Sequence, residues 1–124
     1  MAAPNIVNVA TITAKTAYIT PSNTSENVLL SNAAASGKVL KVNMIVAANI
    51  DGTSAFDTTV SINGAAAGAG TSFKMASTIS IPPDASLIVS DKSTSFYLEE
   101  DRSIVVTSST ASKITYTISY EELS

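Results

Sequence analysis

The chain has 124 residues, a length that suits one domain and is too short for two ordinary ones. Its net charge is −3, and its six lysines and one arginine are scattered, which argues against nucleic-acid binding because phosphate recognition needs clustered cations. Cysteine and histidine are both absent, which excludes disulfides and thiolate metal sites and removes the commonest general base. Only 14% of the residues are charged, and 19 serines and 15 threonines take their place. Threonine together with many valines and isoleucines favours strands, because β-branched side chains pack well on a pleated surface.

The first twenty residues predict one or two strands, at 6–12 and 17–20. Residues 1–9 could instead extend as an arm onto a neighbouring subunit, and the sequence does not decide between the two. The candidate contact residues of such an arm are Pro4, Asn5, Ile6, Val7, Asn8 and Val9. No basic segment followed by a long apolar run is present, and no apolar run approaches the ~18 residues of a membrane helix. We therefore expect a protein that is made in a cytoplasm and stays there or leaves by lysis.

A long central strand is predicted by the alternation of apolar and polar residues that begins at Leu40. The alternation places Leu40, Val42, Met44, Val46, Ala48 and Ile50 on one face, which we expect to face the core. The other face carries Lys41, Asn43 and Asn49, and Ile45 is the exception to the pattern. Turn signals precede and follow the strand, at 36–37 (Ser-Gly) and 51–52 (Asp-Gly).

A short strand at 60–62 is followed by Asn63 and the small-residue segment 64–70, GAAAGAG. This segment predicts a flexible hairpin tip at the surface, or a contact loop against a neighbouring subunit. The candidate contact residues are Gly64, Ala65, Ala66, Ala67, Gly68, Ala69 and Gly70.

Three further alternating runs follow in the second half of the chain. Their apolar positions are Phe73, Met75, Ile79 and Ile81, then Ile104 and Val106, then Ile114, Tyr116, Ile118 and Tyr120. Among the aromatic residues, Phe73, Phe96 and Tyr116 are predicted to lie in the core. Turn residues separate the runs, so we count roughly eight or nine short strands. This spacing predicts an all-β protein with a single β-sandwich over residues 1–124, either a jelly roll or Ig-like, because alternation does not report connectivity.

The residues that could carry catalysis are few. Without histidine or cysteine, a serine would need a lysine as its base (Lys74, Lys92 or Lys113), and no glycine-elbow pattern supports such a pair. Adjacent acids such as Glu99 and Glu100 would point to opposite faces of a strand, and a solvated turn is the simpler interpretation. Asp51, Asp57 and Asp84 lack the spacing of a calcium loop. We predict no enzymatic activity, no cofactor and no metal site.

Several segments read together resemble a known family. They are MAAPNIVNVATITAKT at the start, SNAAASGKVLKVNMIVAANIDGT in the centre, then ISIPPDASLIVSDKS, FYLEEDRSIVVTSS and the final ISYEELS. In order and spacing they are similar to a family of small virion structural proteins of marine tailed phages, notably the T4-like phages of cyanobacteria. The resemblance covers roughly residues 3–123. In the pattern that the resemblance leads us to expect, the turn at this place often reads Glu-Gly-Asp. This sequence has Glu100-Asp101-Arg102 there, so we expect a local difference in turn geometry.

The resemblance implies a component of the virion that is not an enzyme and has no catalytic residues to transfer. Within the particle, a capsid decoration or cement protein is the leading hypothesis, with the major capsid protein, other virion proteins and further copies of itself, for example in a trimer, as partners. A neck, tail or fibre component is the second hypothesis. A carbohydrate-binding module for host attachment is the alternative from another class, although no cluster of exposed aromatic residues argues for it.

Overall fold

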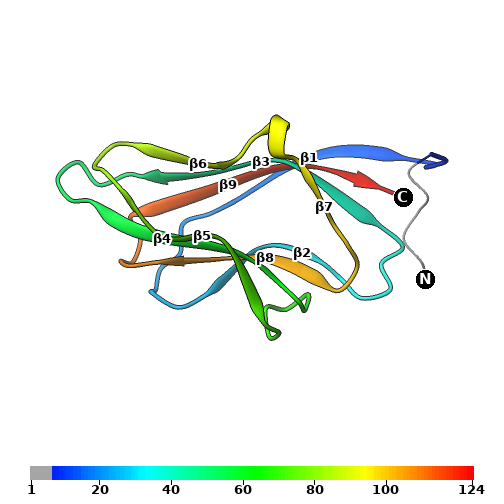
Figure 1. Ribbon diagram of the computed structural model, residues 1–124, viewed down its shortest axis with the longest axis horizontal. Coiled ribbons are helices and arrows are strands. Elements are labelled where there is room, and N and C mark those ends of the chain that lie inside the picture. Colours follow the sequence, from blue (N-terminus) through cyan, green and yellow to red (C-terminus); the bar gives the residue numbers. More distant parts are fainter. Residues whose placement is uncertain (1–6) are drawn as a thin grey trace.

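The computed structural model describes residues 7–124, which form two antiparallel sheets packed face to face (Figure 1). The strands are β1 (Ile12–Ile19), β2 (Asn27–Asn32), β3 (Val39–Asn49), β4 (Phe56–Asn63), β5 (Ser72–Ile81), β6 (Ser86–Ser90), β7 (Phe96–Leu98), β8 (Arg102–Ser108) and β9 (Ile114–Leu123). One 3-10 turn, η1 (Lys92–Thr94), separates β6 from β7. The predicted all-β sandwich is therefore confirmed, and the nine strands match the predicted number.

The strand order identifies the connectivity that the sequence left open. One sheet, here sheet A, has the order β1-β9-β3-β6, with β7 also paired to β3, and the other, sheet B, has the order β2-β8-β4-β5. The pairs are nested from the outside of the chain inward: β1 with β9, β2 with β8, β3 with β6 and β7, and β4 with β5. Such a folded-over ribbon of nested antiparallel pairs is the jelly-roll arrangement.

The core lies between the two sheets and confirms the predicted alternation of β9. Ile114, Tyr116, Ile118 and Tyr120 are buried and face Val60, Ile104 and Val106 of sheet B among others. Each fully buried aliphatic side chain contributes roughly 1.5–3 kcal/mol relative to its exposed state. The Tyr116 hydroxyl donates to the Thr107 carbonyl (3.2 Å) and also bonds the hydroxyls of Thr58 and Ser108. Burial raises the pKa of Tyr116, and the bonds with Ser108 and Thr58 offset only part of that rise.

The predicted core face of β3 is wrong beyond its first half. Leu40 and Val42 are buried as expected, but the buried residues that follow are Ile45, Ala47 and Asn49. The register of β3 against β9 shifts between Val42 and Met44, so Asn43 is an extra residue in a β-bulge. One extra residue moves every later side chain to the opposite face. Met44, Val46 and Ala48 consequently lie on the outer face of sheet A, and Ile50 is exposed beyond the end of the strand.

The predicted apolar face of β5 is confirmed only at Ile81, which is buried. Phe73, by contrast, is 65% exposed, and Met75 and Ile79 are also exposed. Two register shifts against β4 interrupt this strand, and Thr78 has a positive φ of 50°. β5 is also the last strand of sheet B, so one of its sides has no neighbouring strand within the sheet. Phe96 is half-buried and Tyr116 fully buried, in line with the prediction.

Within residues 7–20 the structure has one strand, where one or two were predicted for the first twenty residues. Within the predicted strand at 6–12, residues 7–11 are not part of any strand, and Ile6 lies outside the described residues. Residues 17–19 of the predicted strand at 17–20 form the end of β1, Ile12–Ile19, and Thr20 lies just beyond it.

Three strands end on a buried asparagine whose side-chain amide organises the turn that follows. Asn32 donates to the Lys38 and Leu98 carbonyls, Asn49 to the Ser54 and Ile81 carbonyls, and Asn63 to the Gly70 carbonyl. Their amide oxygens accept further bonds from the same turns. A buried amide needs such partners, because an unsatisfied polar group costs roughly 1–3 kcal/mol. These asparagines therefore fix where β2, β3 and β4 end.

Candidate interaction surfaces

The predicted N-terminal arm is only partly within the described residues. Pro4, Asn5 and Ile6 lie outside them, while Val7 and Asn8 are exposed and Val9 is half-buried. From Ala10 onward the chain is held by the C-terminal residue: the backbone nitrogens of Ala10 and Thr11 donate to the Ser124 oxygen at 2.7 and 3.0 Å. Whether residues 4–9 contact a neighbouring subunit stays a prediction.

The small-residue loop 64–70 connects β4 to β5 and folds back over the outer face of sheet B, below the sheet in Figure 1. The Ala65 carbonyl accepts a bond from the Ser103 hydroxyl (2.7 Å), and the Ala66 carbonyl accepts one from Ser31 (2.7 Å). The Ala66 nitrogen donates to a carboxylate oxygen of Asp101 (3.2 Å). These bonds attach the loop to β2, to β8 and to the turn before β8, so it is not a protruding hairpin tip.

Glycine at position 68 is required for this packing. Gly68 has a φ of +79°, and a Cβ there would lie 3.2 Å from Val28 and 3.4 Å from Val105. The loop thereby covers Val105, which is buried although it points away from the core between the sheets. The predicted contact residues therefore divide: Ala65, Ala66 and Gly68 are half-buried against their own sheet, while Gly64, Ala67, Ala69 and Gly70 are exposed. Contact of the exposed four with another subunit remains a prediction.

The outer face of sheet A is a broad surface with few charges. Residues opposite one another in register share a face, and the register of β1, β9, β3 and β6 gives three neighbouring rows across the sheet. The rows are Thr20-Thr115-Ala48-Ser86, Tyr18-Thr117-Val46-Ile88 and Thr16-Ser119-Met44. They contain no charged residue, and Tyr18 and Ile88 are among the most exposed large hydrophobic residues. The next row brings the first charges, Lys41 and Glu121.

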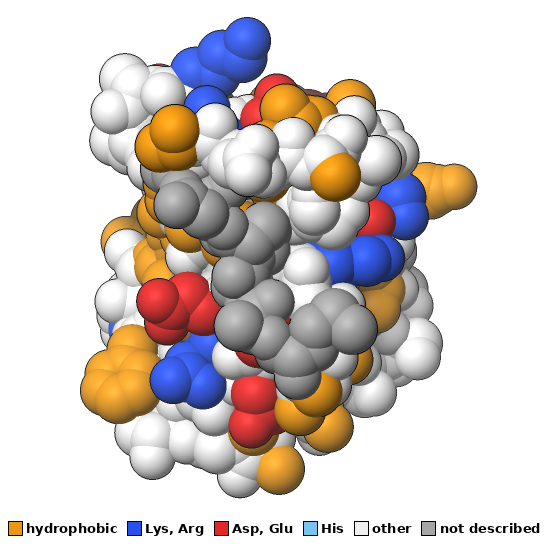
Figure 2. Space-filling view, turned by 90° about the vertical axis from the view of Figure 1, so that its right-hand side faces the viewer, with side chains coloured by type: hydrophobic (Ala, Val, Ile, Leu, Met, Phe, Trp, Pro, Cys, Tyr) orange, Lys and Arg blue, Asp and Glu red, His pale blue; other side chains and the backbone are white. Residues whose placement is uncertain are grey.

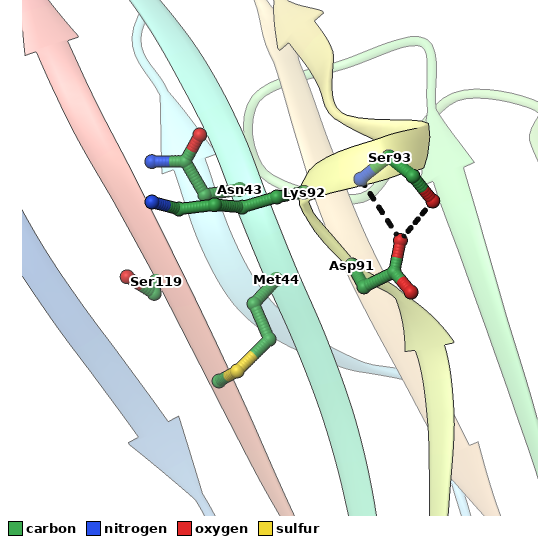
Figure 3. Close-up of a pocket in the computed structure, with 6 residues that line it drawn as sticks. All are labelled: Asn43, Met44, Asp91, Lys92, Ser93 and Ser119. Atoms are coloured by element: carbon green, nitrogen blue, oxygen red, sulfur yellow. Dashed lines mark hydrogen bonds between the residues drawn. The ribbon is translucent and has the colours of Figure 1, made fainter.

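A pocket of about 610 Å³ opens on this face, between the bulge of β3 and η1 (Figure 3). Met44, which the bulge has turned outward, projects into the pocket, and the Lys92 side chain extends across it toward Asn43 (Figure 3). Asp91 is engaged elsewhere, since it accepts bonds from the backbone nitrogen (3.0 Å) and the hydroxyl (2.6 Å) of Ser93. These bonds lower the pKa of Asp91. The pocket thus combines the thioether of Met44, the ammonium group of Lys92 and small polar groups.

A second, smaller pocket of about 260 Å³ lies on the outer face of sheet B and is lined almost entirely by hydroxyl groups. The lining residues are Thr24, Asp57, Thr59, Thr78, Thr107, Ser108 and Ser109. Several of the hydroxyls already serve the fold: Thr59 accepts from the Thr78 nitrogen (3.0 Å) and Ser109 from the Asp57 nitrogen (2.9 Å). An accepting hydroxyl still has a proton to donate, so the pocket offers donors beside one carboxylate.

Charged side chains of both signs gather at the end of the molecule where Ser124 lies, which Figure 2 views directly. Glu122 of β9 accepts bonds there from Lys15 of β1 and from Lys38 ahead of β3, each at 3.1 Å. Burial of Glu122 raises its pKa, but the hydrogen bonds and charges of the two lysines outweigh that effect, so the pKa is lowered overall. The same contact raises the pKa of Lys15.

The residues considered for catalysis are not assembled into a site. Lys74, Lys92 and Lys113 are exposed, and Ser93 beside Lys92 donates its hydroxyl proton to Asp91. Glu99 is exposed, while Glu100 caps a turn by accepting from the Gly37 nitrogen (3.3 Å). Across residues 7–124, no three acidic, histidine or cysteine side chains come together in a way that could hold a metal ion. The same residues contain no helix with the length and apolarity to span a bilayer.

The sequence did not predict the three uncharged rows on the outer face of sheet A, because the bulge at Asn43 has no marker of its own in the sequence. The only hint was the exceptional Ile45 on the polar side of the alternation. Comparison of the chain with protein-family models and with curated proteins finds no match.

Proposed function

We propose that this chain is a non-enzymatic structural protein of a tailed-phage virion, and within the particle a capsid decoration protein that binds the major capsid protein. The sequence resemblance to small virion proteins supports the first part. The observation that carries the second is the set of three uncharged rows on the outer face of sheet A, which present aliphatic, hydroxyl and aromatic side chains. Depletion of charged residues marks the core of protein–protein interfaces.

A jelly roll suits this role because its two faces can serve different purposes. The outer face of sheet B is partly covered by the chain's own loop 64–70, whereas the outer face of sheet A has no such cover from the described residues apart from η1 at its margin. A subunit bound through this face adds buried area to the shell and stabilises the assembled state by mass action. Residues 4–9 and the exposed part of loop 64–70 are the additional contacts we propose. The protein would be made in the host cytoplasm and reside on the particle.

The test is binding of purified variants to particles that lack the protein. Thr117→Lys places a charge in the middle row of the proposed face, and Ser77→Lys places the same charge on exposed β5 of the other sheet. We expect Thr117→Lys to reduce occupancy strongly and Ser77→Lys to leave it unchanged, with both variants retaining the circular dichroism of the parent. Deletion of residues 1–9 should also reduce occupancy without unfolding the domain. Equal occupancy for all three variants and the parent would overturn the proposal.

Location in the particle separates the decoration role from a neck, tail or fibre role. A cryo-EM reconstruction should show density for the chain in regular array over the capsid, at hundreds of copies. Density at the neck, tail or a fibre, at a few to tens of copies, would favour the second hypothesis.

The hydroxyl-lined pocket around Asp57 favours a different function, binding of a carbohydrate. Sugar hydroxyls bond readily to serine, threonine and carboxylate groups, and the pocket presents these together. It lacks an aromatic side chain on which a sugar ring could stack. Binding on a glycan array that Asp57→Asn abolishes would support this alternative, and absence of the chain from the particle would bring it forward.

A further inference from the structure

The four outer strands of the two sheets differ in how well they could pair with another strand. β2 has a register shift between Val28 and Leu30, and β5 has two shifts and a residue with positive φ. The edge formed by β6 and β7 is broken by η1. Bulges and interruptions of this kind are how proteins prevent pairing at sheet edges. Three of the four edges are thus protected.

β1 has no such interruption. Its eight residues pair with β9 in one continuous register, and its other edge has no partner strand among residues 7–124. Its one charged residue is Lys15, which is on the inner face, opposite Tyr120, and bound to Glu122. An inward-pointing lysine ordinarily opposes edge pairing, but a lysine neutralised by its own glutamate does so less. β1 therefore offers unpaired backbone donors and acceptors on a regular strand.

From this we infer that β1 pairs antiparallel with β1 of a second copy of the chain, about a two-fold axis that passes beside Thr16. This pairing would join the two copies of sheet A into one continuous sheet. It concerns self-association of the purified chain and does not depend on the proposed role in a virion.

The register follows from symmetry and charge. A two-fold axis perpendicular to a sheet keeps each side chain on its own face, so a residue must lie opposite a residue of the same face. Two such registers give the longest overlap of β1 with itself, centred on Lys15 or on Thr16. The first would set two lysines directly opposite each other, which is destabilising. The second sets Lys15 opposite Ala17 of the other copy.

The side chains of β1 are self-complementary in this second register. Ile12 and Tyr18 are 62% and 72% exposed and lie on the same outer face. With the two-fold axis at Thr16, Tyr18 of one copy lies opposite the small Ala14 of the other copy. The same Tyr18 is the diagonal neighbour of Ile12 of that other copy. Diagonal neighbours are within reach of an aromatic side chain. The pairing would thus cover the two large exposed apolar side chains of β1 in each copy.

Cysteine cross-linking tests the register, because the chain has no cysteine of its own. Residues directly opposite in an antiparallel pair have Cα atoms roughly 4.5–5.5 Å apart, which is within the range of a disulfide. We expect Thr16→Cys to form a covalent dimer rapidly on mild oxidation, and Ala14→Cys and Tyr18→Cys, on the same face, to remain largely monomeric. Cross-linking at 14 or 18 as fast as at 16, or none at any of the three, would overturn the inference.

Two variants with opposite charges at Thr16 test the association itself. If mixing them restores the dimer, the loss of the dimer in each variant alone is not caused by a failure to fold. Sedimentation velocity should show a concentration-dependent dimer for the parent chain and loss of that dimer for Thr16→Lys and for Thr16→Glu. Mixing the two variants should restore it, because unlike charges then meet at the axis. Ser86→Lys, on the opposite edge of the same sheet, is the control and should dimerise as the parent does. A monomeric parent at all concentrations, a trimer, or failure of the mixture to dimerise would each contradict the proposed pairing.

Discussion

At the scale of single residues, polar groups inside this protein determine where strands stop and how they are held. The buried asparagines at the ends of β2, β3 and β4 bond to backbone groups of the turn and, for Asn32 and Asn49, to a carbonyl of a distant strand. Every buried side-chain nitrogen and oxygen in the described part of the chain has a hydrogen-bond partner. Satisfied polar groups of this kind select one arrangement, because every alternative would leave some of them without a partner.

Tyr116 provides the sharpest test of this point. Tyr116→Phe keeps the ring but removes the hydroxyl that bonds the side chains of Thr58 and Ser108 and the Thr107 carbonyl. We expect the free energy of unfolding to fall by roughly 1–3 kcal/mol, because buried polar partners are left unsatisfied. The measurement is urea denaturation followed by circular dichroism. Tyr97→Phe, on the exposed side of β7, is the matched control and should change stability little. A loss of equal size in both variants would show that the buried hydroxyl network does not stabilise the fold.

At the scale of elements, the loop 64–70 shows how a segment of low complexity can be specific. Its alanine carbonyls accept from serines of β2 and β8, and its glycine at 68 approaches two valines too closely for most side chains. Small residues were expected to make the loop flexible. They instead allow the backbone to lie against the outer face of sheet B.

Gly68→Val tests whether this packing matters. A side chain at this position meets Val28 and Val105 and also disfavours the positive φ, so we expect a loss of roughly 1–3 kcal/mol in the free energy of unfolding. Hydrogen exchange should become faster in β2 and β8 as the loop lifts. Ala69→Val adds the same bulk at an exposed position of the loop and should be nearly neutral. Unchanged exchange in Gly68→Val would mean that the loop does not hold the sheet.

The elements also show how far sequence reasoning extends. Alternation predicted the number of strands, the core face of β9 and the sandwich, because a face buried on one side requires period two. It failed where a bulge intervened: the extra residue at Asn43 reversed the faces of β3, and two shifts accompanied the error at Phe73 in β5. Bulges depend on pairing with a distant strand, which a local pattern does not contain. The first of these bulges places Met44, Val46 and Ala48 on the outer face of sheet A, on which the proposed function rests.

On the scale of the whole molecule, nested pairing brings the first and last strands of the described residues together. β1 and β9 are neighbours, and Lys15, Glu122 and Lys38 connect the first strand, the last strand and the segment before β3. The turn at Glu100, which accepts from Gly37, lies against the same segment. Asp101 supplies the left-handed backbone of that turn, with a φ of 57°, where glycine is the usual residue. These contacts close one end of the sandwich with charged side chains, while the middle of sheet A stays uncharged.

The ion pairs of Glu122 with Lys15 and Lys38 should make the free energy of unfolding depend on pH in a defined window. The pKa of Glu122 is lowered in the folded protein from its ordinary value of 4.5, so the unfolded chain takes up the proton more readily. The contribution of this carboxylate is therefore present above that ordinary value and is lost as the pH falls through the lower folded pKa. The pKa of Lys15 is raised from its ordinary 10.5, so its contribution is complete below that value and is lost as the pH rises through the folded pKa. Between the ordinary pKa of glutamate and the ordinary pKa of lysine, the ion pair of Glu122 and Lys15 contributes fully to stability.

Glu122→Gln keeps the shape of the side chain and removes its charge. We expect this variant to unfold at a lower temperature than the parent near neutral pH, and the difference to shrink as the pH falls through the lowered folded pKa of Glu122, where the parent's carboxylate also becomes protonated. Thermal melts across this range provide the measurement. Glu121→Gln is the control, because Glu121 points to the opposite face of the same strand, beside Lys41 and away from Lys15. If the two variants differed from the parent by the same amount at every pH, the ion pairs of Glu122 would not stabilise the contact of β1 and Lys38 with β9.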